Sequence, residues 1–177
     1  LSREHAVRKV VPGFISVAGG KYTTYRVMAR DAIDAVAAEL RGQIPPSQTE
    51  LIPLVGVSER SLPELSNIPE ASKRRLFKRY GDRISDLDGM IEVDPALGHF
   101  VTGAEPYLRV EVLYGVTHEG ALHLDDILTR RTRISIETGH RGTESADDVA
   151  RVMAKALGWE ETTIAREIEH YLARVRA

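Results

Sequence analysis

The chain has 177 residues, 42% of them hydrophobic, which is enough for one domain-sized core or a core with a short annex. Its 24 Lys and Arg residues nearly balance 26 Asp and Glu residues, so the net charge of -2 gives no global field that would attract nucleic acid. Cysteine is absent, which excludes disulfide scaffolds, thiolate metal sites and cysteine nucleophiles and favours a cytoplasmic setting.

The first twenty residues contain neither the pattern of a membrane-spanning helix nor that of a signal peptide. The longest uncharged stretch, Val10–Gly20, is far shorter than the ~20 apolar residues of a membrane-spanning helix and contains Pro12. The chain opens on Leu1 rather than methionine, and the residues that follow lack the basic and apolar regions of a signal peptide. We expect a piece of a longer protein with no segment that crosses a membrane.

The first elements predicted are a strand and a helix. Phe14–Ala18 is an apolar, partly β-branched run between glycines, which is typical of a buried strand that ends in a tight turn. Residues 23–41 have helical periodicity, with an apolar stripe opposite Arg26, Arg30 and Asp34; the stripe consists of Ala29, Ile33, Val36, Ala37 and Leu40.

A domain boundary is predicted after residue 41. Gly42 can end the helix, and residues 43–50 are polar and proline-rich, as in a linker. We therefore divide the chain into residues 1–41 and an all-helical domain, residues 42–177. The run Leu51–Val55 should be extended, because its proline disfavours a helix.

Helices dominate the second half. Apolar spacing predicts helices over residues 69–80, 84–92, 108–117 and 124–133. A further helix should begin near Ser145 and stop at Gly158, and another amphipathic helix follows it, with a stripe from Ile164 to Val175. Two amphipathic helices joined by so short a turn should pack antiparallel against the rest of the domain.

The segment Gly19–Arg26 joins the predicted strand to its helix and can bind anions. Glycines let a ligand approach the backbone, and the first N–H groups of a helix have no intrahelical acceptor. A phosphate-loop motif is excluded, because Ile15 stands where it needs glycine and Tyr22 where it needs Ser or Thr. A plain strand-to-helix connection, with Thr23 as N-cap and a solvated Lys21, remains open.

The same segment carries a family resemblance. Gly19-Gly20-Lys21-Tyr22-Thr23-Thr24-Tyr25-Arg26, with Ser2-Arg3-Glu4-His5 upstream, resembles the end of the flavin domain in FAD-dependent glycerol-3-phosphate dehydrogenases. The run from Asp126 to Thr132 and the Ala-Leu-Gly-Trp segment resemble the C-terminal domain of that family. The resemblance therefore covers essentially the whole chain.

The resemblance implies a partial active site. Gly19, Gly20, Lys21, Tyr22 and Thr23 would lie against the N1/O2 edge of FAD, which becomes negative on hydride transfer. The phosphate of glycerol 3-phosphate would be held by Lys21 and Arg3, since a dianion leaving water needs paired cations.

The same resemblance implies what lies elsewhere. No Gly-x-Gly-x-x-Gly is present, so the turn that binds the pyrophosphate of FAD would lie in upstream sequence. The catalytic base would also lie upstream, and the piece alone should be inactive. Electrons would pass to a quinone or another acceptor. The resemblance leaves open a homodimer and peripheral attachment to the inner face of the membrane.

Other clusters favour structural roles. His118 and His123 lie roughly 140° apart on a helix, with Gly120 between them, so we expect no metal site. Acids next to Arg130, Arg131 and Arg133 indicate ion pairs between helices rather than a nucleic-acid surface. We assign no catalytic role to the remaining histidines, His5, His99, His140 and His170. This assignment is least firm for His5, because it is close to Arg3 in the sequence.

The sequence thus predicts a mainly α protein: a helical C-terminal domain preceded by a strand–turn–helix remnant of an FAD-binding α/β domain. The leading hypothesis is the C-terminal part of an enzyme that oxidises sn-glycerol 3-phosphate to dihydroxyacetone phosphate. The alternative is a non-catalytic helical module, residues 42–177, for dimerisation or partner binding. An independent nucleotide-binding domain is disfavoured by the missing glycine motif.

Overall fold

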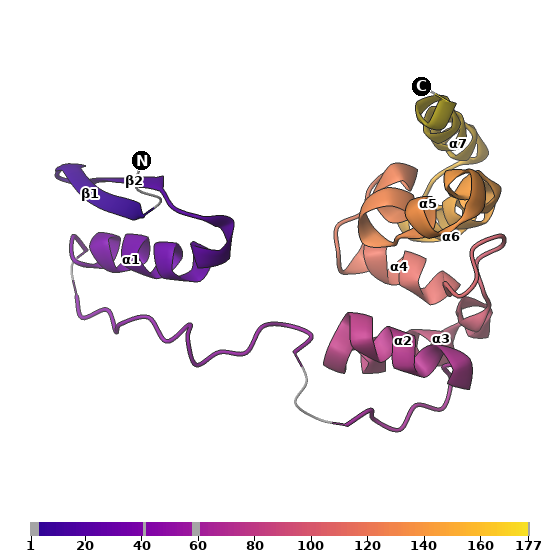
Figure 1. The fold of residues 1–177 in the computed structure, drawn as a ribbon, viewed down its shortest axis with the longest axis horizontal. Coiled ribbons are helices and arrows are strands. Elements are labelled where there is room, and N and C mark those ends of the chain that lie inside the picture. Colours follow the sequence, from indigo (N-terminus) through magenta and orange to yellow (C-terminus); the bar gives the residue numbers. More distant parts are fainter. Residues whose placement is uncertain (1–3, 41, 58–60, 177) are drawn as a thin grey trace. The chain divides into compact units, whose positions relative to one another are not determined.

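The computed structural model describes residues 4–40, 42–57 and 61–176. Contacts between residues divide the chain into two compact units, Leu1–Val55 and Gly56–Ala177. We call them the hairpin unit and the helical unit and describe each by itself (Figure 1). Residues 42–55 were predicted to belong to the helical domain, whereas their contacts group them with the hairpin unit.

The hairpin unit begins with two antiparallel strands, β1 (His5–Val11) and β2 (Phe14–Gly19). Val11 pairs with Phe14, so the two residues Pro12 and Gly13 form the turn, and Gly13 has a φ of 79°. Proline followed by a glycine with positive φ is the pairing that a type II turn requires. The strand β2 is confirmed, but its expected burial is wrong, because its side chains are half-buried or exposed. The strand β1 was not predicted.

Helix α1 (Tyr25–Ala37) follows β2 after a short 3-10 turn, Tyr22–Thr24. It is shorter than the predicted helix over residues 23–41. Met28, Asp31, Ala32 and Ala35 are half-buried at helical spacing, whereas the predicted apolar stripe is exposed, with Ile33 at 62%. Both sides of α1 therefore carry apolar side chains, and the predicted stripe faces outward.

Residues 42–57 form no helix or strand. Leu51, expected in an extended run, instead closes a turn in which its N–H donates to the Gln48 carbonyl at 2.9 Å. None of the described residues of the hairpin unit is buried. This unit has a sheet and a helix but no enclosed core.

The helical unit matches the predicted pattern closely. Helices are found within a few residues of every predicted range, which confirms a mainly α protein. The α-helices are α2 (Glu70–Tyr80), α3 (Ile84–Val93), α4 (Arg109–Thr117), α5 (Ile134–Glu137), α6 (Ala146–Leu157) and α7 (Glu161–Arg176). Short 3-10 turns cover Gly81–Arg83, Pro95–Gly98 and Gly139–Ser145.

The predicted helix over residues 124–133 is π-helical along Asp126–Arg131. The N–H of Thr132 donates to the Ile127 carbonyl, five residues back, at 2.9 Å, and its hydroxyl donates to the same oxygen at 2.6 Å. Gly115 in α4 lets this segment approach, because a Cβ there would lie 2.6 Å from the Ile127 side chain. The wider turn is thus set by a contact between segments.

One continuous core fills the helical unit. Fully enclosed side chains from α2, α3, α4, the π-helical segment and α6 meet in it, including Leu76, Leu87, Val112, Leu128 and Met153. Helix α6 contacts α7, which contributes Ile164 and Tyr171 to the core. Gly158, in the left-handed region with φ 67°, ends α6 as predicted.

Candidate functional site

The strand–helix turn is the predicted site, and its backbone is ordered by Thr24 rather than Thr23. The Lys21 N–H donates to Thr24 Oγ1 at 3.2 Å, and that hydroxyl donates to the Lys21 carbonyl at 3.0 Å. The suggestion of Thr23 as N-cap is therefore wrong: the 3-10 turn over Tyr22–Thr24 moves the start of α1 to Tyr25.

Both glycines of the turn are required by packing. Gly19 and Gly20 have φ values of 79° and 95°, which favour glycine. A Cβ on Gly19 would lie 2.7 Å from the Glu4 carbonyl oxygen, and one on Gly20 would lie 2.4 Å from Met28 Sδ. The glycines thus let β1 and α1 close in on the turn from two sides.

The polar groups of the turn face outward. Lys21, Tyr22 and Thr23 are exposed, Tyr22 at 94%. Among the residues that the structure describes, none forms an ion pair with the Lys21 ammonium. The N–H groups at the start of a helical turn have no acceptor within the helix. Within the described part of the chain, the turn therefore presents an unpaired cation and the N–H groups of Tyr22 and Thr23, which suit an anionic ligand.

Arg3, the other predicted phosphate ligand, lies outside the described residues. Two residues on, His5 has a partner that the sequence analysis missed. Its Nε2 lies 2.8 Å from Asp31 Oδ2 in α1, and the Arg30 guanidinium binds Asp31 Oδ1 through Nε at 2.9 Å. Hydrogen bonds from Arg30 first, and from His5 second, hold the pKa of Asp31 below its ordinary value.

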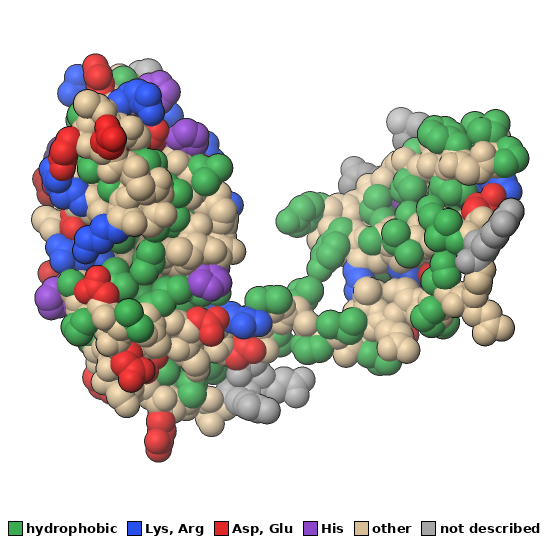
Figure 2. All heavy atoms as spheres, turned by 180° about the vertical axis from the view of Figure 1, so that it is seen from behind, with side chains coloured by type: hydrophobic (Ala, Val, Ile, Leu, Met, Phe, Trp, Pro, Cys, Tyr) green, Lys and Arg blue, Asp and Glu red, His purple; other side chains and the backbone are tan. Residues whose placement is uncertain are grey.

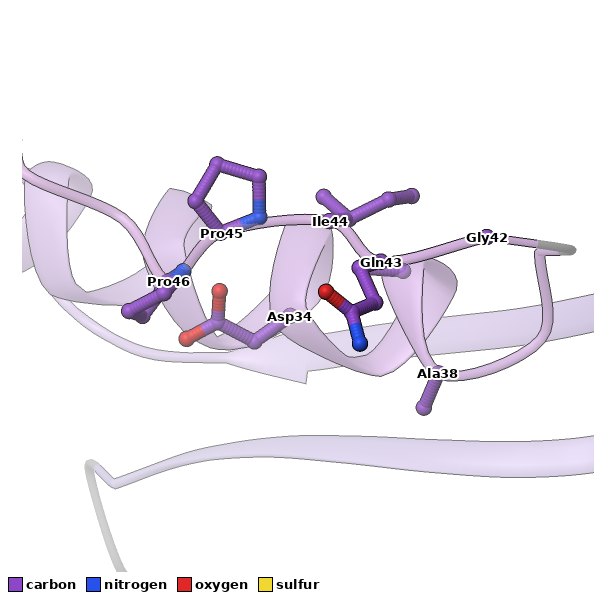
Figure 3. Close-up of a pocket in the computed structure, with 8 residues that line it drawn as sticks. Asp34, Ala38, Gly42, Gln43, Ile44, Pro45 and Pro46 are labelled. Atoms are coloured by element: carbon purple, nitrogen blue, oxygen red, sulfur yellow. The ribbon is translucent and has the colours of Figure 1, made fainter.

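Two hollows lie along α1 in the hairpin unit. One, of about 680 Å³, is lined by the end of the helix and by Gly42–Pro46, with Asp34 and Gln43 at its rim (Figure 3). The other, of about 460 Å³, lies between the exposed apolar stripe of α1 and a segment that includes Ile44, Ile52 and Leu54. Neither contains a residue of the Gly19–Thr23 turn.

Hydrophobic side chains gather on the surface of the hairpin unit, as Figure 2 shows. Val10, Val11 and Phe14 at the tip of the hairpin are each more than half exposed. Apolar surface of this extent on a sheet and a helix is typical of an element that is covered in a larger assembly.

Several charged groups of the helical unit are paired with one another. Glu111 is buried and accepts hydrogen bonds from both Nη atoms of Arg75, from the Leu108 N–H at 2.9 Å and from the Tyr80 hydroxyl at 3.4 Å. Burial first, and Glu111 second, raise the pKa of Tyr80, so the phenol remains a donor. This network orders the core.

The predicted ion pairing of the arginine cluster is found only in part among the described residues. Arg130 binds Asp125 and Asp126, which stand at the start of its own π-helical segment. Arg131 instead donates to the Glu119 carbonyl at 2.8 Å, and no described residue forms an ion pair with Arg133. The contact with a neighbouring helix comes from Arg174 of α7, which binds Asp125.

His118 and His123 lie in different surroundings. His118 follows α4 and stacks on Tyr114, with ring centroids 4.5 Å apart, whereas His123 Nδ1 lies 3.1 Å from Glu167 Oε1. Across residues 4–40, 42–57 and 61–176, no group of three or more His, Asp or Glu side chains could hold a metal ion. Within the same residues, no helix is long and apolar enough to span a membrane.

Comparison with known proteins gives the family. Residues 47–164 match the family described as the C-terminal domain of alpha-glycerophosphate oxidase. The chain is 46% identical over its whole length to glycerol-3-phosphate dehydrogenase 2 of Mycobacterium bovis and 45% identical to glycerol-3-phosphate dehydrogenase of Mycobacterium leprae. It is 31% identical, over 96% of its length, to the mitochondrial glycerol-3-phosphate dehydrogenase of Mus musculus.

The match covers only part of these relatives. The chain spans 32% of the length of each mycobacterial protein and 24% of the mouse protein. The matched family begins at residue 47, so the turn at Gly19–Thr23 precedes it and is covered by the whole-length relatives alone. The chain belongs to the family of the C-terminal domain of alpha-glycerophosphate oxidase and is homologous to the C-terminal third of glycerol-3-phosphate dehydrogenases.

Proposed function

We propose that this chain is the C-terminal part of a flavoprotein that oxidises sn-glycerol 3-phosphate to dihydroxyacetone phosphate, and that the Gly19–Thr23 turn borders the flavin and substrate. The observation that carries the proposal is the Lys21 ammonium, exposed and without an ion-pair partner among the described residues, at a strand–helix turn of a chain whose relatives are named glycerol-3-phosphate dehydrogenases. Glycerol 3-phosphate is a dianion, so a preorganised cation and N–H groups suit its phosphate.

The turn fits a flavin edge for two physical reasons. Lys21, Tyr22 and Thr23 are exposed next to the packed glycines, and N–H groups at the start of the helical turn can donate to a flat ring there. FAD, when bound, supplies the hydride acceptor, and negative charge develops at the N1/O2 edge. Donors fixed before the reaction lower the free energy of that charge without a cost of reorganisation.

Lys21 and Arg3 are assigned different tasks in this proposal. Lys21 provides a point charge for the phosphate, and Arg3 a planar, two-pronged donor. The base that removes the hydroxyl proton lies in the longer protein rather than in this chain. The chain by itself is therefore inactive, a proposal that agrees with the 32% of the relatives' length that it spans.

The exposed apolar surface of the hairpin unit supports the same view. No described residue of this unit is buried, and both faces of α1 carry apolar side chains. A hairpin and one helix are marginal alone in water, so their natural setting is a larger α/β domain that covers them.

The test is Lys21→Ala in the full-length protein, with Lys9→Ala as the matched control. Lys9 is an exposed lysine on β1 that pairs with Glu39 and lies away from the turn. We expect kcat/KM for glycerol 3-phosphate to fall about 100-fold for Lys21→Ala, because a charge that contacts the substrate is lost. Equal activity of the two variants would remove the turn from the active site.

The non-catalytic module remains the competing hypothesis for the helical unit. It predicts that a deletion variant of the longer protein without residues 56–177 still oxidises glycerol 3-phosphate and loses only self-association. Sedimentation velocity and glycerol 3-phosphate oxidation, measured on the same deletion variant, separate the two hypotheses.

A further inference from the structure

His5 and Asp31 connect the two elements that carry the turn. His5 is the first residue of β1 and pairs across the ladder with Gly19, the last residue of β2. Asp31 lies in the second turn of α1, 26 residues away from His5 in sequence. The hydrogen bond between them therefore joins β1 to α1, and the segment Gly20–Thr24 connects β2 to the same helix.

The turn rests directly on this connection. A Cβ on Gly20 would lie 3.3 Å from His5 Cβ and 2.4 Å from Met28 Sδ, so the glycine sits between β1 and α1. Met28 is one helical turn before Asp31, on the same side of α1. A change in the position of His5 relative to α1 would therefore alter the packing around Gly20.

The carboxylate of Asp31 is held in one orientation. Arg30 binds Oδ1 through Nε at 2.9 Å and Nη2 at 2.8 Å, while Oδ2 faces His5 at 2.8 Å. A carboxylate only accepts hydrogen bonds, so the imidazole must carry a proton on Nε2. The His5 side chain is 19% exposed and the Asp31 side chain 34%, so the bond is partly shielded on the histidine side.

The second ion pair of β1 differs in its place and in the exposure of its cation. Lys9 Nζ lies 2.6 Å from Glu39 Oε1, beyond the end of α1 and four residues farther along the strand than His5. The Lys9 side chain is 49% exposed. Exposed pairs of this kind contribute little to structure, so Lys9 is a matched control for His5.

We propose that His5 and Asp31 are positioning residues that fix the Gly19–Thr24 turn against α1, so that its backbone donors and Lys21 keep their places at the flavin and phosphate. The inference rests on the proposed function of the turn. Neither residue touches the reacting atoms: His5 acts through Gly19 and Gly20, and Asp31 acts through His5. Arg30 keeps the Asp31 carboxylate aligned.

The test compares His5→Ala, His5→Gln and Asp31→Asn with Lys9→Ala in the full-length protein. We expect His5→Ala to lower kcat about 10-fold to 100-fold, because a misplacement of about 1 Å in a catalytic group can have that effect. His5→Gln should restore most of kcat, since its amide can donate to Asp31. Asp31→Asn, which keeps the side-chain volume, should lower kcat in the same direction, and Lys9→Ala should match the wild type.

Two further measurements separate positioning from simple folding. In the protein without substrate, amide hydrogens at Tyr22–Thr24 should exchange faster in His5→Ala than in Lys9→Ala, with helical-unit amides unchanged. The reduction potential of the bound flavin should become more negative in His5→Ala, because the donors that stabilise the reduced ring are less well placed.

The outcomes distinguish this inference from the proposed function. If Lys21→Ala abolishes activity while His5→Ala leaves kcat, exchange and potential unchanged, the positioning role is wrong and the function of the turn stands. If His5→Gln is as poor as His5→Ala with equal flavin content, the hydrogen bond to Asp31 is not the cause and the inference fails. If Lys21→Ala has wild-type activity, the proposed function and this inference both fall.

Discussion

The hairpin unit and the helical unit differ in what holds them together. The helical unit encloses a core of buried side chains and even a buried carboxylate, Glu111. The hairpin unit has antiparallel pairing between β1 and β2, with a register shift between Lys9 and Val11, but no buried residue among those described. Backbone pairing alone contributes little net free energy, so the helical unit should be stable by its own packing and the hairpin unit by its surroundings.

The two units also differ in whether their charged side chains are paired. In the helical unit, charged side chains such as Glu111, Asp125 and Arg130 pair with other charged side chains and thereby stabilise the fold. In the hairpin unit, Lys21 has no such partner among the described residues and lies beside open backbone donors. A region with little packing of its own and an unpaired cation is what an element of a larger binding site should look like when it is seen alone.

The largest expected effect is at the buried ion pair. Arg75→Ala would leave the enclosed carboxylate of Glu111 without its cation, and removal of one partner of a buried pair costs about 3–5 kcal/mol. Urea unfolding of the chain, followed by the fluorescence of Trp159, its only tryptophan, measures this loss. Arg151→Ala, which breaks exposed pairs with Asp147 and Glu161, should change the free energy of unfolding by at most about 1 kcal/mol.

A second prediction compares apolar truncations in the two units. Leu76→Ala removes a fully buried side chain from α2 and should lower the opening free energy of α2 and α3 amides by about 2–5 kcal/mol. Ile33→Ala in α1, 62% exposed, should change the opening free energy of α1 amides by less than about 0.5 kcal/mol. Native-state hydrogen exchange measures both, and an effect at Ile33 as large as that at Leu76 would contradict the contrast drawn between the units.

The smallest expected effect is a pH dependence at Asp126. Partial burial acts to raise the pKa of Asp126, but the N–H groups of Leu122 and His123, followed by Arg130, outweigh it and lower the pKa. A carboxyl with a depressed pKa stabilises the fold above its unfolded pKa, near 4, and loses that contribution as the pH falls through its folded pKa.

Asp126→Asn should therefore be less stable than the wild type by about 0.5–1 kcal/mol at pH 7, after allowance for solvent screening. The difference should shrink as the pH falls below about 4. Urea midpoints of the two proteins at pH 7 and pH 3 measure it. A difference that is constant with pH would mean that the charge of Asp126 is not what stabilises the segment.

Periodicity predicted the helical unit because most of its helices bury one face, although α4 is buried on nearly all sides. The spacing of apolar residues and the stop at Gly158 placed α2, α3, α4, α6 and α7 within a few residues of their observed ends. The glycine turn and the strand β2 were also predicted, since glycine pairs and β-branched runs act locally. The strand β1 could have been predicted as well: Pro12-Gly13 between two β-branched runs is a hairpin signal.

Contacts between distant residues were beyond sequence analysis. Nothing in the spacing of His5 and Asp31, or of Arg75 and Glu111, indicates that these side chains meet, because their distances are set by how whole elements pack. The outward direction of the α1 stripe and the π-helical turn at Asp126–Arg131 have the same origin. The sequence by itself determined the local elements and the residue types of the turn. Tertiary packing decided which side chains pair, since pairing depends on long-range geometry that no local pattern encodes.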